Sequence, residues 1–271
     1  SIDKSSFSIG INEKNFLGTG RSVGVSASVS GKKSNFNLSL TEPFFLDRNL
    51  SASANIFKSK LEGKSVTTFQ QGIGFGLGFK AANDVYHRLT YNLTENQTSQ
   101  TTNNSASSTG ESSEKLVSSA IGYRLGIEKR DNRFDPSDGY FAEISETYSG
   151  VGGDVNFLRS VLRGAYYKPV SFDRFVLGAR AETGYIDGFD ESVTQSNRFL
   201  LGGNKVRGFD GSGIGPRDNT SEGAVGGNQY YAGSFEIISN VGLNPDLGMR
   251  WTLFADYGSS WCTVFPTGVV G

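Results

Sequence analysis

The chain has 271 residues, and its 26 basic and 27 acidic residues give a net charge of −1, which provides no basic surface for nucleic acid. Glycine is abundant at 36 residues, but there is no G-X-Y period, so collagen is excluded. The only cysteine, Cys262, rules out a disulfide within the chain, and no apolar run reaches the about 18 residues of a transmembrane helix, although a membrane-spanning β-barrel stays possible.

Apolar and polar residues alternate along one segment after another, which is typical of strands whose two faces meet different surroundings. In "RSVGVSASVS", Val23, Val25 and Val29 share one face opposite serine and glycine. In "GIGFGLGF", Phe75 and Leu77 lie on a face opposite glycines only. We expect twelve strands, at about 5–15, 21–30, 33–42, 49–58, 66–80, 84–95, 114–130, 139–149, 155–168, 173–187, 228–239 and 249–260.

These segments are long for strands of a soluble protein. Their lengths cluster near the ~9–11 residues with which a tilted strand crosses a bilayer, whereas globular strands average ~5–6. Compact turns alternate with polar connections, two of which are very long, at 95–114 and at about 188–227. Alternating short and long loops are typical of an outer-membrane barrel, which we predict. A soluble β-sandwich also alternates, although its strands are shorter, and stays an alternative at this point.

Histidine and cysteine are nearly absent, with one residue of each, and the sequence shows no catalytic or metal-binding motif. His87 is the only histidine and has no cysteine nearby, so a metal site of the His/Cys type is not expected. No nucleophile elbow accompanies it, which argues against a Ser-His-Asp triad. The glycines at 72–78 recur at every second residue and no helix follows, unlike a phosphate-binding loop. The sequence therefore predicts no enzyme activity, no cofactor and no metal.

The most distinctive segment is "FLLGGNKVRGFDGSGIGPRDN", which is followed by "AVGGNQYYAGSFEII" and "LFADYG". These motifs resemble, in family order, the barrel domain of the BamA family, the outer-membrane protein insertases of Gram-negative bacteria. "KNFLGTG" and "DNRFDPSDGYF" also look like turns of that family. The loop motif consists of Gly202, Gly203, Val206, Arg207, Gly208, Phe209, Ile214, Gly215 and Pro216, and the inner-wall motif of Phe254, Asp256 and Gly258.

The resemblance implies an all-β fold, an antiparallel up-and-down transmembrane barrel of sixteen strands of which about twelve are present here. It implies that the loop at about 188–227 folds into the lumen, with its V-R-G-F tip against the inner wall. We therefore expect residues 1–271 to form a partial outer-membrane barrel domain. The POTRA domains, the first strand and the last three strands of the family are not expected in this chain.

The same resemblance implies what the protein does. A BamA-type protein inserts and folds β-barrel proteins in the outer membrane through a lateral seam, without ATP or a cofactor. The implied partners are nascent outer-membrane proteins, the lipid bilayer and accessory lipoproteins that bind mainly to the POTRA domains. Two alternatives stay open, a polypeptide exporter of the same superfamily (two-partner secretion type) and a passive porin, although a loop that fills the lumen argues against the porin.

Strand phase supports one contact independently of the resemblance. In "RWTLFADYGSSW", Leu253 and Tyr257 fall on one face, while Phe254, Asp256 and Gly258 fall on the other. An aspartate on an enclosed face needs a partner, and a guanidinium offers a fork of donors that fits a carboxylate. We therefore predict that Arg207 pairs with Asp256.

Overall fold

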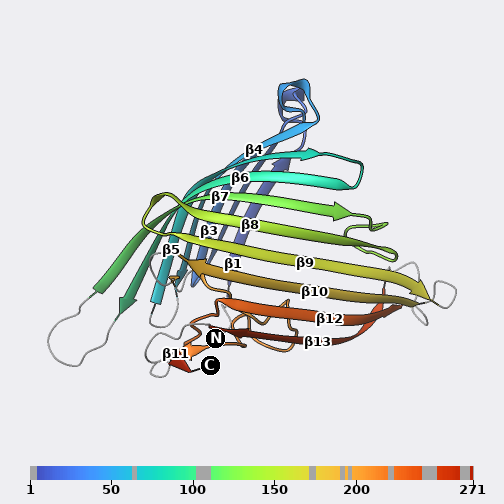
Figure 1. Ribbon diagram of the computed structural model, residues 1–271. Helices are drawn as coiled ribbons and strands as arrows, with labels where there is room; N and C mark the ends of the chain where they lie inside the picture. Colours follow the sequence, from blue (N-terminus) through green and yellow to red (C-terminus); the bar gives the residue numbers. More distant parts are fainter. Residues whose placement is uncertain are drawn as a thin grey trace. The chain divides into compact units, whose positions relative to one another are not determined.

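A computed structural model describes residues 5–62, 66–101, 111–170, 175–189, 193–194, 197–218, 223–239, 249–262 and 269–270. In this part of the chain nearly all regular structure is β (Figure 1). The helical elements there are two three-residue 3-10 turns, η1 (Phe16–Gly18) and η2 (Phe45–Asp47). Among the described residues, none of the helical segments has the length and apolar character needed to cross a bilayer.

The strands follow the predicted segments closely. They are β1 (Ser6–Glu13), β2 (Ser22–Ser30), β3 (Lys33–Glu42), β4 (Leu50–Glu62), β5 (Val66–Lys80), β6 (Val85–Thr101), β7 (Glu111–Glu128), β8 (Gly139–Gly153), β9 (Phe157–Val170), β10 (Phe175–Gly188), β11 (Arg217–Asp218), β12 (Gln229–Ser239), β13 (Trp251–Trp261) and β14 (Val269–Val270). The short β11 and β14 pair with each other outside the large sheet and were not predicted.

Twelve strands form one sheet in the order β1-β2-β3-β4-β5-β6-β7-β8-β9-β10-β12-β13. The pairs whose register is known are antiparallel, so each long strand runs beside its neighbour in the chain. This confirms the predicted number of strands and the up-and-down order. A β-sandwich would need two sheets packed face to face, so that alternative is dropped.

The prediction of a long loop at 95–114 was wrong at both ends. β6 continues to Thr101 and β7 already begins at Glu111, whereas residues 102–110 lie outside the described part. The polar residues that suggested a loop include threonines, whose branched side chains suit a strand. Outside a bilayer both faces of a strand meet water, so a polar ladder continues without an apolar face.

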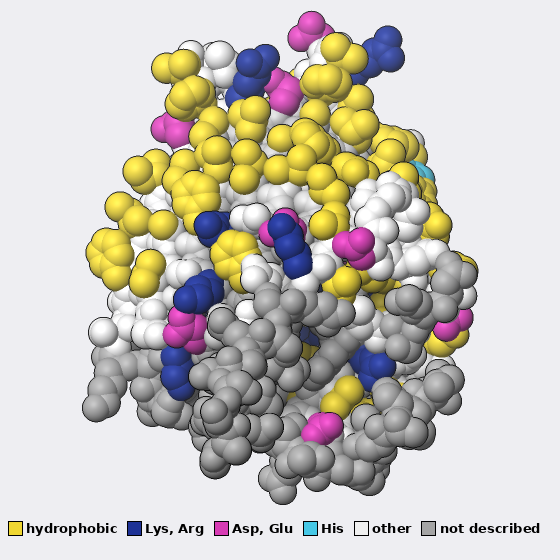
Figure 2. Space-filling model, turned by 90° about the vertical axis from the view of Figure 1, so that its left-hand side faces the viewer, with side chains coloured by type: hydrophobic (Ala, Val, Ile, Leu, Met, Phe, Trp, Pro, Cys, Tyr) yellow, Lys and Arg dark blue, Asp and Glu magenta, His cyan; other side chains and the backbone are white. Residues whose placement is uncertain are grey.

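By compactness the chain divides into two units. Unit 1 comprises residues 1–80, 87–123 and 148–156, and unit 2 comprises residues 81–86, 124–147 and 157–271. In unit 1 the apolar face of the sheet is exposed, as at Phe7, Leu40 and Phe75. Hydrophobic side chains gather over much of the described surface that Figure 2 presents. Such a face fits a bilayer and not water.

Unit 2 contains a true core. Its fully buried large side chains are Tyr230, Ile186, Leu201 and Pro216. Tyr230 and Ile186 come from strands, while Leu201 and Pro216 come from the glycine-rich segment between β10 and β12. The core therefore lies where this segment packs against one face of the sheet.

Candidate functional site: a glycine-rich loop held against the sheet

The segment between β10 and β12, which we call the loop, folds back on itself. Isolated antiparallel bridges join Phe199 to Gly227 and Leu201 to Ile214. Gly203 N–H donates to the carbonyl of Phe209 at 3.0 Å, which closes the tip that carries Arg207. The described part of the loop is thus a compact structure with its own backbone hydrogen bonds.

Arg207 pairs with Asp256 of β13 as predicted. Its Nε donates to Oδ2 at 2.7 Å and its Nη2 to Oδ1 at 2.6 Å, which is the bidentate geometry of a guanidinium and a carboxylate. The backbone N–H of Arg207 also donates to Oδ2, at 2.8 Å. The Asp256 side chain is only 4% exposed, so the pair is shielded from water on the carboxylate side.

The guanidinium also reaches the neighbouring strand β12. Its Nη2 lies 2.7 Å from the Ser234 hydroxyl and 2.8 Å from Oε1 of Glu236. Arg180 Nη2 on β10 lies 2.8 Å from the same Glu236 oxygen. Two acidic and two basic groups therefore alternate across three strands, and the hydrogen bonds to Asp256 raise the pKa of Arg207 above its usual value.

The register of β12 and β13 brings these partners to one face. Asp256 stands opposite Ser234, and Phe254 stands opposite Glu236. The Phe254 ring lies under the guanidinium carbon at 3.6 Å, a cation–π contact. Alternate residues on both strands therefore surround Arg207 on one side.

Gly258, the third residue of the inner-wall motif, receives the apolar part of the loop. A methyl group on it would lie 2.9 Å from Cγ2 of Val206 and 3.2 Å from Cδ2 of Leu201. Val206 is 3% exposed and Leu201 is fully buried. Glycine at 258 therefore lets the loop approach the strand closely.

The other glycines of the loop motif are needed for the turn itself. Gly202 has φ +137° and Gly208 has φ +90°, regions that residues with a side chain rarely adopt. A methyl group on Gly202 would also meet the carbonyl of Asp210 at 1.9 Å. These positions shape the tip and do not contact the wall.

The remaining residues of the loop motif differ in how far they are buried. Pro216 is fully buried, and a methyl group on Gly215 would lie 3.2 Å from Cβ of Ser260 on β13. The backbone N–H of Ile214 donates to the carbonyl of Leu201 at 3.0 Å, which holds the two sides of the loop together. Phe209 is 53% exposed, so it is the one bulky motif side chain directed away from the buried interface.

A second anchor was not predicted from the sequence. Lys205 Nζ lies 2.6 Å from Oε1 of Glu182 on β10 and 3.0 Å from the hydroxyl of Tyr230 on β12. It also lies 4.1 Å above the Tyr230 ring, and that hydroxyl donates to Glu182. Gly184 makes room for this ring, since a methyl group there would meet Cε1 of Tyr230 at 2.3 Å.

A buried acidic residue on β8 was also missed. Glu143, 5% exposed, accepts from the hydroxyl of Tyr86 at 2.7 Å and from Arg163 Nε at 2.8 Å, and Arg124 Nε lies 3.3 Å away. Four strands meet in this cluster. One carboxylate between two guanidiniums is an ion-pair cluster in the wall of the sheet. Within the described part of the chain, no group of His, Cys, Asp and Glu side chains is placed to hold a metal ion.

Comparison with known proteins agrees with this architecture. The model of the Omp85 superfamily domain matches residues 15–268. The chain is 29% identical over 251 residues to the outer membrane protein assembly factor BamA of Neorickettsia risticii (strain Illinois), which covers 91% of this chain and 34% of that protein. It spans about a third of the length of the curated BamA relatives that it matches.

Two solved structures share the fold. BamA from Haemophilus ducreyi lacking POTRA domains 1–3 matches with a TM-score of 0.82 and 22% identity, over 95% of this chain and 55% of that one. CdiB from Acinetobacter baumannii matches with a TM-score of 0.59 and 16% identity, over 93% of this chain and 46% of that one. At these identities the likeness is one of fold.

Proposed function

Because the chain belongs to the Omp85 superfamily of outer-membrane β-barrel proteins, we propose that it is the barrel part of an insertase, which folds nascent β-barrel proteins into the bacterial outer membrane. The observation that carries the proposal is the sequence similarity to three curated outer membrane protein assembly factors BamA, which are 24–29% identical to this chain over 91–94% of its length. The shared fold with a BamA barrel, at a TM-score of 0.82, agrees with this choice.

The proposed mechanism uses a strand edge at a lateral seam. The free N–H and C=O groups of an edge strand pair with the backbone of an incoming client strand, as in β-augmentation. In hydrocarbon an unpaired backbone group costs several kcal/mol, so each new ladder bond drives insertion and no ATP is required. Nascent outer-membrane proteins are the proposed clients, and accessory lipoproteins the proposed partners.

The proposed role of the loop motif is to stiffen β10, β12 and β13 while a seam opens elsewhere. Arg207 ties the loop to two of these strands, and Lys205 ties it to two of them as well. A loop held by such contacts on the polar face leaves less room for free passage of solutes. This supports the insertase proposal against a passive porin.

A polypeptide exporter of the same superfamily is the second candidate. The observation in its favour is the shared fold with CdiB, over 93% of this chain. The lower TM-score of that match, 0.59 against 0.82, makes the insertase the better supported candidate.

The experiment is a folding assay with the full-length protein that carries this chain, reconstituted in liposomes. An unfolded client barrel is added, and the folded fraction is read from its shifted gel mobility without heating. We expect faster client folding than in empty liposomes and slower folding with Arg207→Ala. Arg48→Ala, at an exposed turn, is the matched control. Client folding no faster than in empty liposomes, together with transport of a soluble polypeptide, would reverse the choice of candidate.

A further inference from the structure

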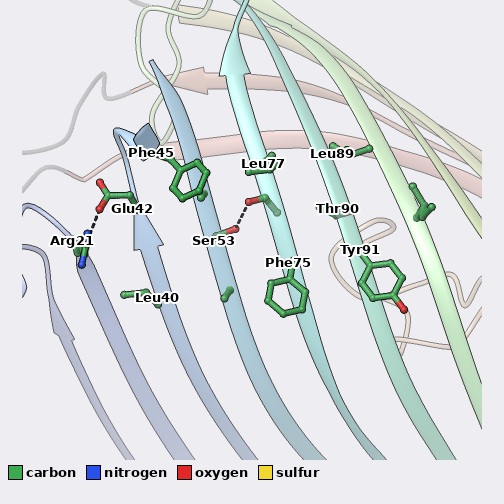
Figure 3. A pocket seen from close by; sticks show the side chains of 14 residues that line it. Arg21, Leu40, Glu42, Phe45, Ser53, Phe75, Leu77, Leu89, Thr90 and Tyr91 are labelled. Carbon is green, nitrogen blue, oxygen red and sulfur yellow. Dashed lines mark hydrogen bonds and ion pairs between the residues drawn. The ribbon is translucent and has the colours of Figure 1, made fainter. Parts of the chain in front are cut away.

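The apolar face of unit 1 is not uniform, because a groove of about 700 Å³ runs across it from β3 to β7 (Figure 3). Its volume is within the ~300–1,000 Å³ usual for small-molecule sites. Leu40, Phe75, Leu77 and Leu89 line it as exposed apolar side chains. It belongs neither to the loop nor to its contacts in unit 2.

Strand register explains why the surface is hollowed here. Ala54 on β4 stands between Leu40 on β3 and Phe75 on β5, in one row across the sheet. In the next row, Ala52 has Leu77 as its partner on β5. Two small side chains in succession thus form a floor between larger ones, about 7 Å long at a rise of about 3.4 Å per residue.

The turn end of the groove is charged. Arg21 directly precedes β2, and Glu42 is the last residue of β3. Nε of Arg21 donates to Oε2 of Glu42 at 2.5 Å, and both residues line the groove, with Phe45 of η2 beside them (Figure 3). The Arg21 side chain is 56% exposed and the Glu42 side chain 21%, so both can be reached from outside.

We propose that this groove binds one phospholipid of the surrounding membrane, with an acyl chain over Ala52 and Ala54 and a zwitterionic headgroup on Arg21 and Glu42. The proposal rests on the outer-membrane location and not on the insertase function. An aliphatic lining with an acid–base pair at one end matches a lipid with a phosphate and an ammonium at one end of its chains.

The charge pattern selects this headgroup chemistry. Arg21 contacts Glu42 through its Nε and its side chain is 56% exposed, so a phosphate oxygen can reach its terminal nitrogens. A carboxylate has about four acceptor positions, and Glu42 uses two of them for Arg21 and for the backbone N–H of Phe44. The others suit an ammonium. A purely anionic headgroup would face Glu42 as a like charge.

Native mass spectrometry of the protein released from nanodiscs tests the proposal. The nanodiscs contain equal parts of phosphatidylethanolamine and phosphatidylglycerol. We expect one retained phosphatidylethanolamine. Ala54→Leu fills the floor of the groove and should abolish retention. Ala27→Leu, on β2 and on the same apolar face of the sheet but outside the groove, should not.

Arg21→Ala should lower the retained fraction roughly fivefold, the factor expected for one basic side chain beside a charged headgroup. Arg48→Ala, in the exposed turn after η2, should leave it unchanged. Since Arg21 is exposed, this variant tests the headgroup contact even if Ala54→Leu does not fold.

Equal retention in Ala54→Leu and the unsubstituted protein would overturn the site. A preference for phosphatidylglycerol, or retention that ignores Arg21, would overturn the headgroup assignment. Client folding plays no part in this readout, so a failure here is distinct from a failure of the insertase proposal.

Discussion

Arg207→Ala is expected to cost about 3 kcal/mol of barrel stability, because it removes one member of a largely buried ion pair. Loss of one partner of a buried pair typically costs ~3–5 kcal/mol, against ~0–1 for an exposed pair. The Asp256 side chain is 4% exposed, and after the substitution its carboxylate still accepts a hydrogen bond from the backbone N–H of residue 207 but has lost the guanidinium. Arg207 itself is 28% exposed, which places the expected cost at the lower end.

Arg207→Ala leaves Glu236 with one of its two ion-pair partners. Arg180 Nη2 lies at 2.8 Å from its Oε1 and stays in place when Arg207 is removed. The main unpaired charge is therefore on Asp256. Arg207→Lys restores a positive charge but lacks the planar fork, so it should recover only part of the lost stability.

The assay is urea unfolding in detergent, followed by tryptophan fluorescence, together with limited proteolysis of the loop. Asp256→Ala combined with Arg207→Ala should be less destabilising than the sum of the two single changes, since neither charge is then left alone. An Arg207→Ala cost below about 1 kcal/mol, with no new cleavage in the loop, would refute the reasoning, because it is the value of a solvated pair.

Three further changes test separate contacts. Lys205→Met should cost about 1 kcal/mol in the same urea assay, less than Arg207→Ala, because Lys205 and Glu182 are 37% and 27% exposed and water replaces part of their contact. Gly258→Ala should cost about 1–3 kcal/mol by overpacking against Val206, seen as a lower urea midpoint with an unchanged slope. In the β7–β8 turn, a hydrogen bond from Ser137 lowers the pKa of Asp131 to about 2. The ionised Asp131 therefore stabilises the turn fully above its unfolded pKa of about 3.9, and this contribution is lost as the pH falls through about 2. Limited proteolysis of the turn at a series of pH values measures the loss.

Much of the fold could be predicted from the sequence because a strand exposes its period of two directly. Val23, Val25 and Val29 needed no knowledge of their neighbours to be placed on one face. Strand ends were less predictable, since beyond the bilayer the polar residues before Thr101 no longer alternate but still pair. The alternation of apolar and polar residues arises because one face of the strand is buried in the membrane, and it does not arise from the backbone hydrogen bonds between strands.

A site residue could be predicted only where its position on one face of a strand, or its place in a recognised motif, pointed to it. Asp256 has an inward phase, and Arg207 lies in a resembling motif, so their pairing could be expected. Lys205, Glu182 and Tyr230 carry no such pattern, because their meeting depends on the register of β10 against β12 and on how the loop folds back. Register is a property of two strands and is not written in either alone.

The position of Asp256 also explains how the two faces of β13 fix each other. Leu253 and Tyr257 are exposed on the apolar face, while Asp256 is buried under the loop. A slip of one residue would exchange these faces and place a carboxylate toward the bilayer, where an ionised group costs several kcal/mol, while Arg207 would lose its partner. Both penalties arise from the same displacement, so the ion pair that holds the loop also enforces the register of the strand on which it rests.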